Sequence, residues 1–296
     1  MNQPDKYTVV ELSDGFGAAT LAGKILADFG HTVIKPEGRE GDSLRLGTPN
    51  QPGRSSILFD LVSSSKHSVG VNFTGDRVKT ALDALFRKTD ILIVDQAYRE
   101  RFREAGLTLE QIHADHKHMT IGAVTPFGLN GPLASWKGNE EIIQAISGIM
   151  SVTGHAEAGP TRISSNIVTH ATALFAVSSM VADRLNHGSG GAGHLLDINL
   201  LNTAVGFLTT SFPVFFLTGK SPRGIGNAHT MIGPWNSFRC KDGWIVICSG
   251  SQPVWTRLCQ AIGRPDFVTD PRFAKEEDRM ANIKQLEQEI ENWTMT

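Results

Sequence analysis

Short apolar runs rich in β-branched residues alternate with longer segments of helical periodicity along the first half of the chain. Residues 7–12 predict a strand, and residues 18–29 carry apolar side chains at helical spacing and end before Gly30. The pattern recurs with a helix over residues 76–88, and further strands are predicted at HTVIK, SVGVNF, DILIVD and HMTIGAV. This alternation predicts an α/β fold in which helices cover a parallel sheet.

The second half contains apolar helical segments followed by a change in composition. Residues 139–149 and 168–185 predict two buried helices, and a glycine-rich turn precedes another predicted helix around residues 195–208. Residues 219–229 are rich in Gly, Pro and basic side chains, which is typical of a linker.

A smaller α/β region follows this linker. Two short strands are predicted on either side of a turn at Asp242 and Gly243, and helices are predicted over residues 254–262 and 282–293. We therefore expect three parts, which are a large domain over residues 1–200, a linker over 201–225 and a smaller domain over 226–296.

Composition narrows the classes of partner. The 296 residues are 40% hydrophobic and 20% charged, which is typical of a globular protein. The formal net charge of −2 provides no general basic surface, so we expect no nucleic-acid partner. No basic and apolar leader precedes the first predicted strand, and no apolar run reaches the ~18 residues that a membrane span requires. We expect no membrane partner and a cytoplasmic location.

The three cysteines, Cys240, Cys248 and Cys259, predict neither a disulfide framework nor a metal site. Their number is odd and their spacing matches no CxxC motif. Cys248 lies in the apolar run WIVIC, so we expect it to be a buried thiol. This usage of cysteine favours a reducing compartment.

Two motifs that resemble cofactor sites are weak. The loop over residues 14–17 offers Gly15 and Gly17, but Thr20 stands where a dinucleotide fingerprint has its third glycine. We interpret these glycines as parts of a tight turn. The segment HADHKH contains His113, His116 and His118 without a cysteine partner, and a solvated loop is the favoured interpretation. We expect no metal site and no permanently bound cofactor.

An ordered set of segments covering nearly the whole chain resembles the family III CoA transferases, which include formyl-CoA, carnitine and bile-acid CoA transferases and the related α-methylacyl-CoA racemases. The segments include VVELSDGFGAATLAGKILADFGHTVIKPEGREGDSLR, TPFGLNGPLASWKG, GSGGAGHLLDINLLNTAV and DGWIVICSGSQPVWTRLCQAIGRPDFVTDPRF. The resemblance implies a Rossmann-like large domain, a smaller second domain, and two ring-like subunits interlocked in a homodimer. Relatives continue past the motif that ends this chain at Thr296, so we expect the smaller domain to be truncated relative to the family.

The resemblance also implies a site for CoA or acyl-CoA as a substrate. The implied positions are Arg39, Val71, Asp95, Gln96, Arg103 and Lys137. Basic side chains at some of them suit a ligand with several phosphates, because the overall charge of the chain supplies no positive field. Each basic residue can alternatively be a solvated surface charge.

In the family an aspartate attacks the acyl-CoA carbonyl to form a mixed anhydride, and here the motif RISSNIVTHATA places Thr169 at that position. A threonine hydroxyl is a poor nucleophile without an adjacent base. His170 is badly placed to serve as one, because neighbouring helical residues point about 100° apart. Glu140 matches a family glutamate that supports the site, or it is a carboxylate stabilising a helix N-terminus.

Racemase chemistry would need a histidine near Asn139 and an aspartate at Thr169, and neither is present. The first-loop glutamine of many transferases is Phe16 here. We therefore predict a CoA-binding protein of the transferase type, with weak or altered exchange of CoA between an acyl-CoA and a small carboxylic acid. The alternatives are a catalytically silent subunit that pairs with a related transferase, and racemase-like or isomerase-like chemistry. The apolar helices over residues 171–182 and 195–208 favour a homodimer or such a pairing.

Overall fold

The computed structural model describes residues 6–46, 56–73, 78–187 and 191–296. The chain divides into two compact units. The large unit comprises Met1–Ile149 and Arg162–Phe212, and the small unit comprises Met150–Thr161 and Pro213–Thr296. The division after Phe212 falls inside the stretch expected to be a linker, and the segment Met150–Thr161 belongs to the small unit.

The large unit is built on a six-stranded, fully parallel sheet, so the α/β prediction is confirmed. The strand order is β3-β2-β1-β4-β5-β6, which is the order of a doubly wound Rossmann-like sheet. The strands are β1 (Thr8–Leu12), β2 (Thr32–Glu37), β3 (His67–Gly70), β4 (Ile91–Asp95), β5 (Thr120–Thr125) and β6 (Leu195–Asn199).

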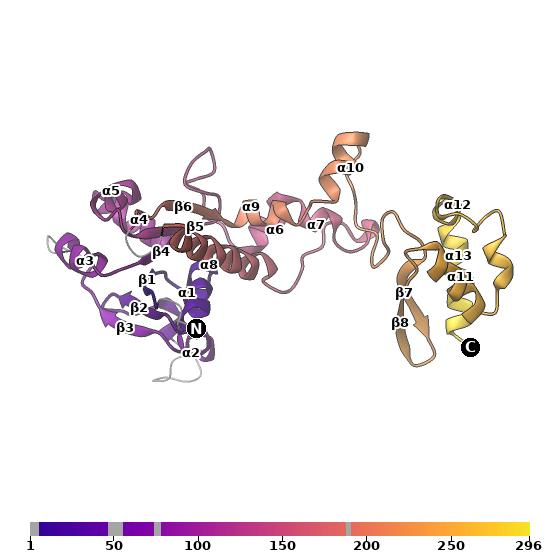
Figure 1. Cartoon of the computed structure of the whole chain (residues 1–296), viewed down its shortest axis with the longest axis horizontal. Coiled ribbons are helices and arrows are strands. Elements are labelled where there is room, and N and C mark those ends of the chain that lie inside the picture. The colour runs from indigo at the N-terminus through magenta and orange to yellow at the C-terminus, as the bar shows by residue number, and fades with distance from the viewer. Residues whose placement is uncertain (1–5, 47–55, 74–77, 188–190) are drawn as a thin grey trace. The chain divides into compact units, whose positions relative to one another are not determined.

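Helices cover both faces of this sheet (Figure 1). Those of the large unit are α1 (Ala18–Asp28), α2 (Ile57–Ser63), α3 (Val78–Phe86), α4 (Gln96–Glu104), α5 (Leu109–Asp115), α6 (Glu140–Ser147), α8 (Ile167–His187) and α9 (Leu200–Gly206), with a 3₁₀ turn at Ser43–Leu46. Helices α3, α4 and α5 share one apolar core with alternate residues of the strands, among them Leu92, Val94 and Ile121. Helices α1 and α8 pack side by side, and both contact the sheet. Residues 76–77 of the helix predicted over 76–88 lie outside the described residues.

One element differs from its prediction. Residues 195–208 were expected to form a single helix, but they form strand β6 followed by α9. The edge of β5 supplies a hydrogen-bonding partner for Leu195–Asn199, in the register Ile121↔Leu195 to Thr125↔Asn199. The helix begins only after Asn199, whose side-chain oxygen accepts a bond of 2.8 Å from the Asn202 amide and caps it.

A buried ionic cluster fixes the loop that follows β1. The Glu11 carboxylate lies 3.1 Å from Lys35 Nζ and 2.7 Å from Lys66 Nζ, and Lys35 lies 2.9 Å from Asp42. Burial by itself disfavours the charged amine of Lys35, but the Glu11 and Asp42 carboxylates outweigh it and raise its pKa to about 12. Lys35 also donates to the Ser13 carbonyl over 2.8 Å. Gly23 of α1 allows the helix to approach this cluster, because a Cβ there would overlap the Glu11 carboxylate.

The small unit has its own core. It contains α10 (Ser211–Thr218, which begins just before the division), an antiparallel pair of strands, and a helical group, with α7 (Ile149–Val152) at its first boundary. The remaining elements are β7 (Trp235–Cys240), β8 (Gly243–Cys248), α11 (Gln252–Ala261), α12 (Glu276–Ala281) and α13 (Ile283–Thr294), with 3₁₀ turns at Ala156–Ala158 and Pro265–Val268. The core gathers Phe238, Trp255, Phe267, Phe273 and Leu286.

The expectation of a buried Cys248 was wrong. Ile247 packs against the core of the small unit, so the next residue of the strand points to the opposite side, and Cys248 is exposed. The buried thiol is Cys259 on α11, and burial raises its pKa to about 11.

Among the described helices, no single one is both long and apolar enough to cross a bilayer. Helices α9 and α10 reach that length and composition only when they are taken together as a bent pair.

Candidate functional site

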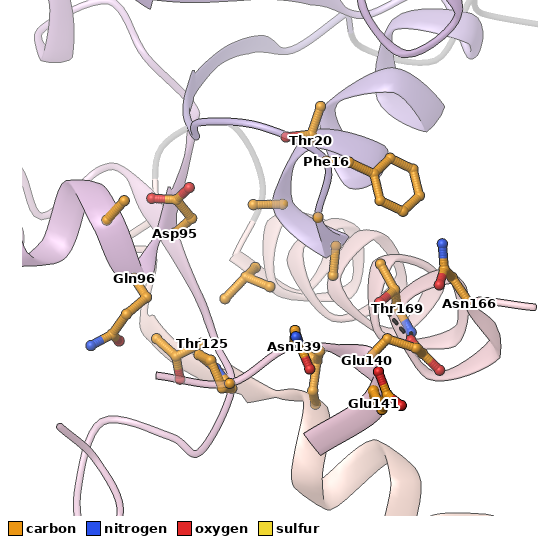
Figure 2. A pocket seen from close by; sticks show the side chains of 18 of the residues that line it. Phe16, Thr20, Asp95, Gln96, Thr125, Asn139, Glu140, Glu141, Asn166 and Thr169 are labelled. Carbon is orange, nitrogen blue, oxygen red and sulfur yellow. Dashed lines mark hydrogen bonds between the residues drawn. The ribbon is translucent and has the colours of Figure 1, made fainter. Parts of the chain in front are cut away.

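A cavity of about 490 Å³ opens at the carboxyl end of the parallel sheet (Figure 2). The winding of the sheet reverses between β1 and β4, and the loops that leave these two strands diverge there, which is where open parallel sheets bind ligands. Its lining includes the polar or charged side chains Asp14, Thr20, Asp95, Gln96, Thr125, Asn139, Glu140, Glu141, Arg162, Asn166 and Thr169.

The β1 loop lies on the β4 side of this cavity. The Asp14 amide donates to Asp95 Oδ2 over 2.8 Å, and the Tyr98 amide donates to Asp95 Oδ1 over 2.8 Å, so Asp95 both holds the loop and caps α4. Burial raises the pKa of Asp95 to about 6 against these two bonds. The Thr20 hydroxyl donates to the Gly15 carbonyl over 2.8 Å, and Gly15 has a φ of +76°, so this segment is the tight turn predicted for it.

Glu140 and Thr169 form the opposite side of the cavity (Figure 2). Glu140 is the first residue of α6, and its carboxylate reaches the N-terminus of α8. Its Oε1 accepts the Val168 amide over 3.0 Å, and its Oε2 accepts both the Thr169 amide and the Thr169 hydroxyl over 2.7 Å. The first amides of a helix have no partner within the helix, and here a carboxylate from another helix satisfies two of them.

A buried glutamine completes this junction. Gln144 lies one turn after Glu140 on α6 and donates to Glu140 Oε1 over 2.8 Å. Its own oxygen accepts the Ile163 amide over 2.9 Å, which positions the segment that enters α8. Burial by itself would raise the pKa of Glu140, but the bonds from Gln144, Thr169 and Val168 outweigh burial and lower it. Glu140 is therefore an anion at neutral pH.

Thr169 is buried, and its hydroxyl proton is already directed to Glu140. His170 is exposed and turns away from that hydroxyl, because its Nδ1 lies 2.7 Å from the Asn166 carbonyl one turn earlier. The ring of Phe16 lies 6.1 Å from the His170 ring, centroid to centroid. The described contacts therefore give Thr169 an acceptor for its proton but no histidine base.

A second cavity, of about 1280 Å³, lies beside the ends of β2 and β3 and contains two of the sequence-predicted positions, Arg39 and Val71. Lys79 and Arg101 also line it. Arg101 Nη2 lies 3.7 Å from Asp14 Oδ2, so a residue of the second cavity contacts one that lines the first.

The six sequence-predicted CoA positions do not lie in one cavity. Asp95 and Gln96 line the first cavity, and Arg39 and Val71 line the second. Arg103 and Lys137 are exposed and are not among the lining residues of either.

Two charged residues that line the cavities, Asp14 and Arg101, were not among the sequence-predicted positions. Arg101 and Arg103 are two residues apart on α4, which separates their directions by about 200°, so only one can face the cavity. Tyr98 and Phe102 are the buried residues of α4 and define its inner face. The angular positions of Arg101 and Arg103 relative to this face would have distinguished the two arginines. The role of Asp14 depends on contacts between segments distant in the sequence.

The histidines of HADHKH do not meet at a common point. His113 Nε2 lies 2.8 Å from the Gly193 carbonyl, and His116 is buried with its ring against Phe86. His118 is exposed.

Comparison with known proteins places the chain among CoA transferases. The model of CoA-transferase family III matches residues 5–296. The acetyl-CoA:oxalate CoA-transferase of Acetobacter aceti is 30% identical over 275 residues, covering 90% of this chain and 69% of the relative. The succinyl-CoA–D-citramalate CoA-transferase of Chloroflexus aurantiacus is 30% identical over 300 residues, covering 98% and 72%. The crystal structure of a CAIB/BAIF family protein from Brucella suis superimposes with a TM-score of 0.80 at 28% identity, covering 98% of this chain and 77% of that one.

The Glu140 junction makes stability depend on pH. We expect Glu140→Gln to lower the free energy of unfolding at pH 7 by about 1–3 kcal/mol, because an amide offers one acceptor oxygen to donors that now meet a carboxylate. The folded pKa of Glu140 lies below its ordinary value of 4.5. Its contribution is therefore complete above pH 4.5 and is lost as the pH falls through the folded pKa.

Urea unfolding of the native chain and the variant from pH 3 to pH 7 measures this difference. Glu141→Gln is the matched control, because Glu141 is exposed and its ion pair with Arg162 spans 4.0 Å. The capping role would be contradicted if both substitutions lowered the free energy of unfolding equally. It would also be contradicted if the difference in this free energy between the native chain and Glu140→Gln grew toward pH 3.

Proposed function

Because the chain belongs to CoA-transferase family III, we propose that it binds a CoA thioester across its two cavities and transfers CoA to a small carboxylic acid with weak or altered activity. The relatives named above act between acetyl-CoA and oxalate and between succinyl-CoA and D-citramalate, so the proposed substrates are an acyl-CoA and a small carboxylic acid. CoA is a substrate in this proposal, and no permanent cofactor is required.

The two cavities suit the two ends of such a ligand. The second cavity is lined by the basic side chains Arg39, Lys79 and Arg101, which suit the phosphates of the nucleotide. Its lining also includes Glu37, Glu40 and Glu104, and Glu37 is paired with Arg45. The first cavity is lined by Gly17 and Gln96, at the N-terminal ends of α1 and α4, where backbone amides favour anionic groups. The thioester carbonyl and the acceptor carboxylate would occupy this first cavity.

The hydrogen bond from Thr169 Oγ1 to Glu140 Oε2 carries the proposal of altered activity. In anhydride chemistry a carboxylate oxygen attacks the thioester carbonyl, the C–S bond breaks and CoA leaves as a thiolate. The resemblance places Thr169 where the family has the attacking aspartate. A hydroxyl there would have to lose its proton to Glu140, an acceptor whose lowered pKa makes it a weak base.

Exposed apolar side chains support assembly with another chain. Ile142 and Ile146 on α6, and Leu174 and Phe175 on α8, are between 41% and 57% exposed. We propose that a homodimer, or pairing with a related transferase subunit, covers them. Pairing with an active relative would make this chain the silent partner. We also propose a cytoplasmic location, which the three free cysteines support.

Thr169→Asp should create or raise CoA exchange, by about tenfold or more, because it supplies an ionisable nucleophile at the position that the family uses. The measurement is chromatographic exchange between short acyl-CoAs and free dicarboxylic acids, with Thr169→Asn as the isosteric uncharged control. A folded Thr169→Asp protein without gain would count against a retained transferase site and favour the silent subunit.

Removing Arg101 should weaken CoA binding by about tenfold, since a guanidinium–phosphate bond is charge-assisted. Calorimetry with CoA on the native chain, Arg101→Ala and Arg103→Ala measures this, and Arg103→Ala should bind as the native chain does. Absence of binding at millimolar CoA, or equal losses in the two variants, would overturn the proposed placement.

The assembly proposal predicts a mass of twice 32.1 kDa by light scattering at micromolar concentration. Phe175→Glu should shift the chain toward the monomer, because it places a charge on the apolar face of α8. A native chain that is already monomeric would contradict the homodimer and leave pairing with a related subunit, which co-purification tests.

A further inference from the structure

We propose that Asp183, His187 and His194 bind one divalent transition-metal ion of the Zn²⁺ class at the amino-terminal end of β5 and β6. One ligand atom from each of the three side chains lies within 4.8 Å of the others. This group lies at the end of the sheet opposite the cavity that contains Thr169, and the proposal does not depend on CoA transfer.

Helical geometry brings the first two ligands together. Asp183 and His187 are four residues apart on α8 and therefore share one face of its last turns. His187 Nδ1 lies 3.7 Å from Asp183 Oδ1 and 2.9 Å from the Asp183 carbonyl. A donor bond from Nδ1 to this carbonyl leaves the lone pair of the neutral ring on Nε2, a common arrangement for metal-binding histidines. Nε2 is then the ligand atom of His187 in this proposal, and the 3.7 Å separation shows that the ring lies near Asp183 without being a distance between two ligand atoms.

The third ligand is held by the sheet. The His194 carbonyl accepts the Ile121 amide over 2.8 Å, and the amide of the preceding Gly193 donates to the Lys117 carbonyl over 2.8 Å. Gly193 packs so closely on β5 that a Cβ there would lie 2.6 Å from backbone atoms of Met119 and Thr120. The start of β6 is therefore fixed, and the His194 ring lies 4.6 Å from the His187 ring, centroid to centroid.

The carboxylate is oriented by bonds that leave one oxygen for a metal. Asp183 Oδ2 accepts the Thr120 hydroxyl over 2.6 Å and the His194 amide over 3.1 Å. Asp183 Oδ1 faces both histidines and lies 2.6 Å from His194 Nδ1. Hydrogen bonds of this kind to the second oxygen are typical of metal-binding carboxylates.

Two imidazoles and one carboxylate select borderline ions such as Zn²⁺, Co²⁺ or Fe²⁺ over Ca²⁺ and Mg²⁺, which prefer oxygen ligands. Asp183 Oδ1 and His194 Nδ1 now lie 2.6 Å apart in direct contact. A bound ion would replace this contact and move the two atoms to about 3.3 Å from each other, which is the separation of two ligand atoms that each lie ~2.0 Å from a tetrahedral ion. The His194 side chain is 58% exposed and has room for this movement. Three protein ligands leave a fourth position for water.

Calorimetry of the full chain, first stripped with EDTA, tests this site with ZnCl₂. We expect one ion per chain to bind through this group, and His194→Ala and His187→Ala each to weaken binding by about tenfold or more. His118→Ala is the control, because His118 is an exposed histidine outside the group. Both ring removals leave Asp183 with its buried bond to Thr120, which avoids the folding problem expected for a substitution of Asp183.

Absorption of the Co²⁺-loaded chain distinguishes nitrogen and oxygen ligands from the exposed Cys248 thiol. The proposal is supported if the Co²⁺-loaded chain shows Co²⁺ absorption bands without a thiolate charge-transfer band, and if these Co²⁺ bands are lost in His194→Ala. No Zn²⁺ binding, binding unchanged by both substitutions, or a thiolate spectrum would overturn it and leave the three residues as an ion-paired cluster.

Discussion

The carboxylate of Glu140 is the constraint on which the candidate site depends. It begins α6 and accepts two backbone amides and one hydroxyl at the start of α8. Two helix N-termini therefore share one negative charge, which fixes where α8 starts and which residue of its first turn faces the cavity. Because the Thr169 proton is bonded to this carboxylate, the same interaction that builds the site also limits what Thr169 can do chemically.

The sheet supplies the other half of the geometry. Its reversal of winding between β1 and β4 opens the cavity, and the buried cluster of Glu11, Lys35, Lys66 and Asp42 holds the β1 loop against the wall that Asp95 forms. The chain belongs to CoA-transferase family III, and the resemblance to that family places Thr169, which is not a carboxylate, at the position of the family's aspartate. The contacts that hold the β1 loop and its wall in place involve residues other than Thr169.

The order of strands and helices in the large unit could be predicted from the pattern of apolar residues within each segment. The alternation of β-branched runs and helical segments was enough for the parallel sheet. The predictions failed where contacts with distant segments decide the structure. Residues 195–199 form strand β6 because they pair with the edge of β5. Cys248 is exposed because the neighbouring Ile247 faces the core of the small unit. At the site, Thr169 and Glu140 followed from resemblance, but their hydrogen bond joins residues that are 29 positions apart. Arg101 and Arg103 point to different sides of α4, and of the two only Arg101 lines the second cavity. Asp183, His187 and His194 come together through the packing of α8 against β6.

We infer that the Thr169 hydroxyl remains bonded to Glu140 and does not accept an acyl group. Intact-protein and peptide mass spectrometry of the native chain, incubated with acyl-CoAs and divided into samples with and without hydroxylamine, tests it most directly. We expect no acyl adduct on Thr169 in either sample. An acyl group located on the Thr169 hydroxyl, formed at a rate that matches turnover, would contradict it.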